Sequence, residues 1–404
     1  MNSGKPWGRL TGVRPTKIVH RRLDLGEDPA DIQAFLCSCY EVSPEKAALL
    51  TEVALANRFL VPTPDTALHE SRTVSLYIGI PYCVSRCVYC SFPSALLPTD
   101  EGQIVCLLEA IGQDIQAVVK LLSNCGMSAQ SLYIGGGTPT CLPGVYFKKL
   151  LDWLVAAFDI AAMKEFTIEA GRPDSIDGEK LACMRQAGVT RLSINPQSMN
   201  QTTLDRIGRR HQAAEIPDAV KLAREAGFRL INMDLIAGLP GETALHMRES
   251  LAQVLEAEPE NITVHTLALK RGAELNESAQ FADMPAPSTI RRMVADSASE
   301  IRAAGLKPYY LYRQKNSPGD LENVGYARTD SICVYNVDMI EERRTIIGMG
   351  PSSASKAVVP AEWRLESCHF PKDIPTYVKR IHELAAKRER LIQNLFQHRT
   401  ATDG

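Results

Sequence analysis

The chain alternates short apolar runs with longer segments in which apolar residues recur every three or four positions. Short apolar runs predict strands, and a period near 3.6 residues predicts amphipathic helices. The predicted strands cover residues 74–80, 131–134, 165–169, 191–194, 229–234 and 261–265. The predicted helices between them cover residues 103–122, 146–158, 175–186, 213–226 and 244–257. Strands and helices in this alternation indicate parallel βαβ units.

Six such units fall within residues 71–310, and residues 309–312 predict a further strand. We therefore expect an α/β fold, an incomplete TIM-like (β/α)6 barrel whose two missing units leave a lateral opening. Residues 1–70 predict an N-terminal helical segment with a linker, and residues 311–404 a C-terminal α+β extension on the substrate side. Within that extension, residues 377–395 predict a surface helix whose basic residues form a solvated face.

Composition narrows the class of protein. The chain has 404 residues, of which 45% are hydrophobic and 23% charged, with a formal net charge of −2. These values are typical of a globular protein and provide no basic field for nucleic acid. No apolar run approaches the roughly 20 residues that span a bilayer. The polar N-terminus lacks the apolar core of a secretory signal, so we expect a cytoplasmic protein with reduced thiols.

Three cysteines, Cys83, Cys87 and Cys90, fall within eight residues directly after the first predicted strand. Three thiolates in one loop can hold three irons of a [4Fe-4S] cluster and leave the fourth iron open to another ligand. A structural zinc site is the alternative, but it needs a fourth Cys or His close by in the sequence. Cys106 is nearest on the C-terminal side, and we expect it to be buried on the apolar stripe of the next helix.

A second set of residues follows the predicted strands, at the end of the barrel where this fold places its chemistry. Glycines 135–137 and Thr138 come after the second strand, and the absent side chains let a ligand approach the backbone closely. Glu169, Gln197 and Asp234 follow the third, fourth and fifth strands. Because lone buried polar groups are costly, three of them at one mouth indicate a binding site rather than core.

Residues 77–92, with the CxxxCxxC spacing, resemble the signature of radical S-adenosylmethionine (radical SAM) enzymes. The resemblance implies a [4Fe-4S] cluster held by the three cysteines, with one or two SAM molecules, of which one binds the open iron and is cleaved to a 5′-deoxyadenosyl radical. It implies that Glu169 and Arg209 contact the amino-acid part of SAM. Gln197 and Asp234 would hold its ribose. By the family pattern the SAM-binding residues are Tyr77, Gly136, Gly137, Thr138, Glu169, Gln197, Arg209 and Asp234.

Longer segments resemble the oxygen-independent coproporphyrinogen III oxidase-like family, and HemZ-type coproporphyrinogen dehydrogenases in particular. Residues 10–20, 169–173 and 310–316 carry this likeness, which covers nearly the whole chain. It implies oxidative decarboxylation of two propionates of coproporphyrinogen III to vinyl groups, giving protoporphyrinogen IX. It also implies a flavodoxin- or ferredoxin-type electron donor, and an electron acceptor that the sequence does not identify.

Two positions depart from the oxidases of this family: Phe92 replaces a further cysteine, and Gly79 replaces a histidine. The heme-chaperone branch also lacks that cysteine, so a heme-binding chaperone is one alternative. Its His-Asn-x-x-Tyr-Trp segment aligns with residues 335–340, where Asn336 alone is kept. A two-SAM radical enzyme acting on another large substrate is the other alternative.

The candidate substrate contacts are chosen by charge. Coproporphyrinogen carries four carboxylates, and the chain as a whole is slightly acidic. Local cations must therefore compensate, and Lys270 and Arg271 follow the sixth strand. Arg313 follows the next predicted strand, and we expect its guanidinium to hold a carboxylate in a bidentate pair. Tyr310 and Tyr312 would offer a flat surface to the macrocycle.

Overall fold

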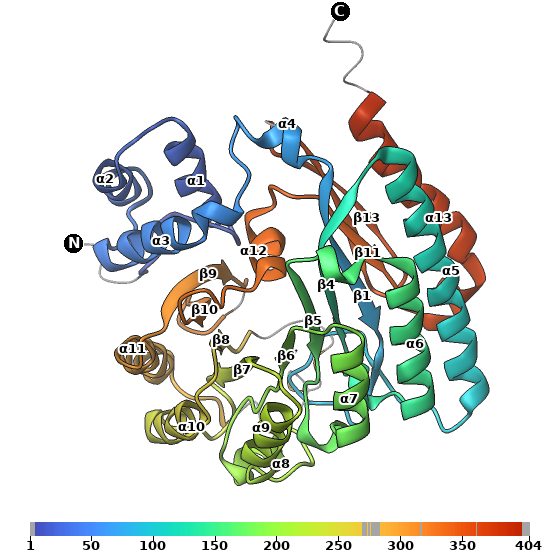
Figure 1. Cartoon of the computed structure of the whole chain (residues 1–404). Helices are drawn as coiled ribbons and strands as arrows, with labels where there is room; N and C mark the ends of the chain where they lie inside the picture. The colour runs from blue at the N-terminus through green and yellow to red at the C-terminus, as the bar shows by residue number, and fades with distance from the viewer. Residues whose placement is uncertain are drawn as a thin grey trace, which may run out of the picture.

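The computed structural model describes residues 5–268, 273, 275, 283–315, 317–360 and 362–397. In this part of the chain, six parallel strands form the centre of one large sheet, and they coincide with the six predicted runs (Figure 1). They are β1 (Thr73–Ile80), β4 (Ser128–Gly136), β5 (Glu165–Glu169), β6 (Arg191–Ser193), β7 (Leu230–Ala237) and β8 (Asn261–Thr266). The predicted incomplete (β/α)6 barrel is confirmed.

Helices cover the outer face of this curved sheet (Figure 1). They are α5 (Glu101–Cys125), α6 (Gly144–Ala157), α7 (Gly178–Gln186), α8 (Gln201–Arg206), α9 (Glu215–Glu225), α10 (Ala244–Glu256) and α11 (Pro287–Ala303). Several begin where the sequence supplies a capping side chain: Asp100, Asp177 and Asn200 accept hydrogen bonds from backbone N–H groups in the first turns of α5, α7 and α8.

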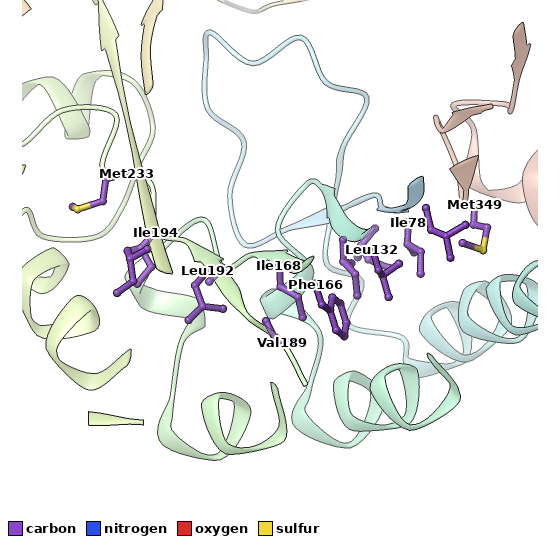
Figure 2. Close-up of a cluster of buried hydrophobic side chains, with 14 of the residues drawn as sticks. Ile78, Leu132, Phe166, Ile168, Val189, Leu192, Ile194, Met233 and Met349 are labelled. Carbon is purple, nitrogen blue, oxygen red and sulfur yellow. The ribbon is translucent and has the colours of Figure 1, made fainter. Parts of the chain in front are cut away.

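Side chains alternate along the strands, because successive residues point to opposite faces of a sheet. On β1, Leu76 and Ile78 are fully buried. Their neighbours Ser75 and Tyr77 instead contact polar and aromatic groups inside the barrel. Figure 2 shows apolar side chains of neighbouring strands directed to the helix layer, among them Ile78, Leu132, Phe166, Ile168, Leu192 and Met233. The hydrophobic core therefore lies between sheet and helices, and the barrel interior is polar and aromatic.

The C-terminal part extends the sheet at both edges. Antiparallel β10 (Glu322–Ala327) and β9 (Lys307–Arg313) follow β8, while β11 (Ile346–Met349) runs parallel to β1 on its other side. β12 (Ala354–Val359) and β13 (Arg364–His369) continue that edge. Strand β9 therefore runs across the division predicted between residues 310 and 311, and β1 lies inside the sheet.

Helix α12 (Val334–Glu341) fills the base of the barrel interior. Its Tyr335 ring stacks on Tyr133 of β4, with ring centres 4.5 Å apart, and on Tyr77 of β1 at 5.9 Å. Asp338, one turn further, accepts hydrogen bonds from Gln130 at 2.9 Å and from Ser75. The interior is thus filled at the amino ends of the strands, which leaves the carboxyl ends for a site.

The N-terminal helices are held against the end of α12 by buried polar contacts. The helices are α1 (Thr16–Asp24), α2 (Pro29–Tyr40), α3 (Pro44–Asn57) and α4 (Ala67–Glu70). The carboxylate of Glu341 accepts hydrogen bonds from Thr16 at 2.9 Å and Asn57 at 3.0 Å. Arg343 pairs with Asp24 at 2.6 Å, and both side chains are buried. These contacts fix the helical segment to the barrel.

Two expectations about the solvent exposure of side chains were wrong. Cys106 is exposed, because it lies two residues after buried Ile104 and therefore on the opposite side of α5. The basic face of α13 (Ile374–Gln397) is not wholly solvated, since Arg388 is buried and pairs with Asp114 of α5 at 2.6 Å. Within the described residues, no helix combines the length and apolar character needed to cross a membrane.

Candidate cluster and cofactor site

The three cysteines lie in one loop between β1 and α5. Cys83 belongs to β2 (Tyr82–Cys83), which pairs with β3 (Ala95–Leu96) and so closes the loop at its base. Cys87 and Cys90 form a turn in which the Cys90 N–H donates to the Cys87 carbonyl at 3.0 Å. All three side chains are half-buried. Burial raises the pKa of the Cys83 and Cys90 thiols, so a bound metal is needed to hold them as thiolates.

A polar anchor fixes this loop to the barrel. The Ser85 hydroxyl donates to the Gly208 carbonyl at 2.9 Å and accepts from Arg172 at 2.6 Å. The Val88 N–H donates to the Ile207 carbonyl at 3.1 Å. Arg172, which is buried, was not among the predicted site residues, and its position shortly after the third strand was the signal that could have found it.

The glycine segment after β4 passes directly against the cysteine loop. A Cβ atom on Gly137 would lie 2.3 Å from the Tyr82 carbonyl oxygen and 2.9 Å from Cys83 Sγ. Gly136 has φ +111°, which L side chains rarely adopt. The Thr138 hydroxyl donates to Cys83 Sγ at 3.7 Å. Only glycine therefore allows the cysteine loop to approach this closely, whereas the close approach of a ligand stays a prediction.

Glu169, at the end of β5, lies beside that glycine segment. Its carboxylate accepts hydrogen bonds from the Tyr133 hydroxyl at 2.6 Å and from the Gly136 N–H at 3.3 Å. Burial raises the pKa of Glu169 to about 7, and the Asp234 charge adds to this rise, although the two hydrogen bonds oppose it. Among the described residues, no cation forms an ion pair with Glu169, so the carboxyl group is suited to receive one from a ligand.

Asp234 on β7 lies in a chain of polar groups that reaches β9. It accepts a hydrogen bond from Asn232 at 2.8 Å, and His265 Nε2 lies 3.6 Å from its Oδ2. His265 Nδ1 is 3.1 Å from the Tyr312 hydroxyl. Burial opposes ionisation of Asp234, but His265 and Asn232 outweigh it and lower its pKa. His265 was missed, although it ends the sixth predicted strand and the strand-end rule would have found it.

Gln197 and Arg209 present polar atoms that the described part of the chain leaves without partners. Gln197 has φ +68°, and its buried Oε1 accepts no hydrogen bond there. Arg209 donates from Nη2 to the carbonyls of Gly171 at 2.9 Å and Asn195 at 2.6 Å, while its buried Nε has no partner. Unpaired buried groups of this kind are costly, and a bound ligand would relieve the cost.

A cavity of about 600 Å³ lies between the cysteine loop and the strand ends, and Gln197 is the predicted strand-end residue that lines it. One wall is the cysteine loop from Tyr89 to Pro93, and the facing wall is formed by the ends of β7 to β10. Residues that line it include Cys90, Phe92, Gln197, Ile236, His265, Tyr312, Gln314, Ser352 and Lys372. Ser352 and Lys372 were missed, because nothing in the sequence places residues after β11 beside a loop near residue 90.

Other predicted residues lie elsewhere. Tyr77 is deep in the barrel, in the stack with Tyr133 and Tyr335, and Tyr310 is buried with its hydroxyl 3.1 Å from Thr263. Arg313 is on the opposite face of β9 from Tyr312, where it pairs with Asp320 at 2.6 Å. Its guanidinium also lies 4.9 Å from the centre of the buried Trp7 ring. Lys270 and Arg271 fall outside the described residues.

The donor set suits a [4Fe-4S] cluster with SAM. Three thiols share one loop, which packs against a glycine segment and lies near a carboxyl group suited to an ammonium. Within the residues described, no three His, Cys, Asp or Glu side chains converge on a point that could hold one metal ion. A cluster needs no such convergence, because each cysteine binds a different iron. The zinc alternative therefore gains no support.

Comparisons with known proteins agree with this geometry. The family model of the radical SAM superfamily matches residues 77–254. The oxygen-independent coproporphyrinogen-III oxidase-like protein HemZ of Bacillus subtilis is 36% identical over 395 residues, which cover 98% of this chain and 78% of HemZ. The heme chaperone HemW of Escherichia coli is 35% identical over 290 residues, 71% of each chain.

Among solved structures, coproporphyrinogen III oxidase (HemN) from Escherichia coli, a radical SAM enzyme, superposes with a TM-score of 0.63 at 23% identity. The match covers 82% of this chain and 73% of HemN. At this identity the likeness shows that the fold is shared.

Proposed function

The chain belongs to the radical SAM superfamily and, within it, to the oxygen-independent coproporphyrinogen-III oxidase-like family, and from this premise we propose that it is a coproporphyrinogen III dehydrogenase. It would convert two propionate groups of the substrate to vinyl groups and give protoporphyrinogen IX. The observation that carries the proposal is the cavity in which the cysteine loop, Gln197 and an aromatic wall with His265 and Tyr312 meet. Its volume falls within the range of ordinary ligand sites, about 300–1,000 Å³.

When bound, the cluster and SAM would supply a 5′-deoxyadenosyl radical able to take a hydrogen atom from a propionate side chain. Loss of carbon dioxide and transfer of one electron to an acceptor then complete each vinyl group. The chain contributes binding and orientation. Cys83, Cys87 and Cys90 would hold the cluster, while Glu169 would accept the SAM ammonium and Asp234 the ribose hydroxyls.

The substrate would occupy the side of the cavity formed by β8, β9 and the C-terminal part. Tyr312 and His265 line it, and Lys372 provides a cation there. An ammonium at this position can pair with a propionate carboxylate while the ring system lies on the aromatic wall. Lys372 therefore takes the role that the sequence suggested for Arg313, whose guanidinium is committed to Asp320.

A heme-binding chaperone is the second candidate, favoured by the 35% identity to HemW and by Phe92 at the position of the further cysteine. One observation weighs against it. Tyr335, which aligns with the histidine of the chaperone motif, is buried in the stack with Tyr77 and Tyr133 and is not available to a heme at the mouth. A two-SAM enzyme with another large substrate is the third reading.

An anaerobic assay with the cluster reconstituted separates these functions. Protein, SAM, a chemical reductant and coproporphyrinogen III are incubated, and porphyrins are identified by mass spectrometry after oxidation. The dehydrogenase is supported if products appear that have lost one and two carboxyl groups. The Cys87→Ala variant is the control, and it should form none of these products. Stable hemin binding and transfer to an apo-hemoprotein without new porphyrin support the chaperone. SAM cleavage with neither result points to another substrate.

A further inference from the structure

A turn at residues 350–352, between β11 and β12, brings Ser352 into the wall of the cavity. The turn packs closely on the end of β1. A Cβ atom on Gly79 would lie 2.8 Å from the Pro351 carbonyl oxygen, and one on Gly350 would lie 2.4 Å from the Gly79 carbonyl oxygen. The turn therefore takes the space that a side chain at residue 79 would need, directly beside the strand that leads into the cysteine loop.

A buried carboxylate holds this turn from the side of the helices. Asp114 of α5 is fully buried, and its Oδ2 accepts hydrogen bonds from the Gly350 N–H at 3.1 Å and from the Tyr377 hydroxyl at 2.8 Å. Arg388 pairs with Oδ1 of the same carboxylate at 2.6 Å. The backbone before Ser352 is thus fixed by the fold, and the position of Ser352 in the cavity wall is fixed with it.

Ser352 combines a strained backbone with an unused hydroxyl. Its φ is +62°, which L side chains rarely adopt, and its buried Oγ has no hydrogen-bond partner in the described part of the chain. Of the described residues that line the cavity, only Gln197 shares both features. Strained residues of this kind gather at ligand sites, and an unpaired buried hydroxyl calls for a partner. A glycine at residue 352 would avoid the strain but would supply no hydroxyl.

Lys372 lies on a segment that is bonded to this turn. The Ser352 N–H donates to the Pro371 carbonyl at 2.8 Å, so Ser352 and Lys372 lie on adjoining backbones, and both residues line the cavity. The neighbouring Asp373 is engaged at the start of α13, where it accepts a hydrogen bond from the Thr376 N–H at 2.8 Å. No Asp or Glu is among the described residues that line the cavity. This part of the wall therefore favours an anion.

We propose that Ser352 and Lys372 form a two-point site for one carboxylate of the substrate, in which the hydroxyl donates to one oxygen and the ammonium to the other. The inference rests on the proposed function in that the carboxylate is a propionate of the porphyrinogen. An ammonium on a flexible stem attracts an anion from many directions, whereas a hydroxyl on a fixed turn accepts one placement. Ser352 thus determines which propionate is held there and how the ring is oriented.

Binding of coproporphyrin III to the cluster-loaded protein, measured by fluorescence quenching, tests the proposal. Its tetramethyl ester is the comparison ligand, because it lacks free carboxylates. Ser352→Ala and Lys372→Met should each weaken binding of the acid about tenfold, as expected for a lost hydrogen bond to a charged group, and leave binding of the ester unchanged. In the double variant the loss should be smaller than the product of the two single losses, because both groups hold the same carboxylate.

The matched control is Ser353→Ala, because the Ser353 hydroxyl donates to the Gly350 carbonyl at 2.7 Å within the turn. It reports the cost of loosening the turn. Ser352→Gly separates binding from folding, because it removes the hydroxyl together with the strain at φ +62°. Its thermal midpoint should equal or exceed the wild-type value while binding of the acid weakens as in Ser352→Ala.

Unchanged affinity for the acid in Ser352→Ala, or an equal loss in Ser353→Ala, overturns the proposal and leaves the proposed function standing. If the wild type binds acid and ester equally, the carboxylate site fails, and the formation of vinyl products decides the proposed function separately. If the variants show the expected pattern but no vinyl product forms in the anaerobic assay, the carboxylate site stands and the proposed reaction fails.

Discussion

Two glutamates on β5 stand at opposite ends of the barrel and have opposite surroundings. Glu165, at the base, accepts hydrogen bonds from Cys333 Sγ at 3.1 Å and the Val334 N–H at 3.0 Å, and pairs with Arg191 at 3.3 Å. Glu169, at the mouth, has hydrogen bonds but no ion pair with any residue that the structure describes. The carboxylate at the base holds the N-terminus of α12 in place. A buried carboxyl group that lacks such an ion pair is suited to a ligand's ammonium, which is the role proposed for Glu169.

The largest effect should come from removing a cluster ligand at the mouth while the base is untouched. We expect Cys87→Ala to lose the broad visible absorbance of the cluster and all SAM cleavage. The thermal midpoint of the metal-free protein should stay close to the wild-type value, since Cys87 is half-buried in a loop outside the core. Full retention of cluster and cleavage would contradict the assignment.

The reverse change, at the base, should affect stability rather than binding. Glu165→Gln leaves Arg191 buried without its charge partner, which costs about 3–5 kcal/mol in comparable sites. Urea unfolding should show this loss. Glu169→Gln is the matched change at the mouth and should reduce stability much less, because no described cation loses an ion-pair partner there. Equal losses in the two variants would remove the distinction between the two ends.

A smaller effect is expected at Asp234, which lies at the mouth on β7. Asp234→Ala should weaken SAM binding by about 1–3 kcal/mol, the cost of losing hydrogen bonds from the ribose hydroxyls. Equilibrium binding of SAM to the cluster-loaded protein measures the change. Glu260→Ala, on the loop before β8, is a control that should leave the affinity unaltered. An unchanged affinity in Asp234→Ala would show that the SAM ribose does not bind at Asp234.

The smallest effect is a pH dependence carried by Glu169, whose pKa is raised to about 7. Below that pH the carboxyl group is protonated before SAM binds, and it must lose its proton to pair with the ammonium. SAM affinity should therefore rise as the pH increases from 6 toward 7, by no more than about tenfold per pH unit, and level off above. Glu169→Gln should bind SAM more weakly and without this slope.

The strands and most of the polar residues at the barrel mouth could be predicted from the sequence. Both the alternation of side chains along a strand and the position of a residue just after a strand depend only on neighbouring residues. The alternation of side chains also explains one error, the expectation that Tyr312 and Arg313 both contact the substrate. The two residues are consecutive on β9, so their side chains point to opposite faces. Contacts between distant segments could not be predicted. Lys372 reaches the cavity only because β11 to β13 join the sheet beside β1, and Arg388 is buried only because α13 packs on α5.

The position of β1 inside the sheet has a consequence for synthesis of the chain. Ser75 of β1 pairs with Ile346 of β11, so the strand that leads into the cysteine loop gains its second neighbour only after a segment far along the chain has been synthesised. Until then β1 has a bare edge, which invites pairing with other chains. Strand β1, and with it the start of the cysteine loop, therefore becomes an interior part of the sheet only once β11 has joined it.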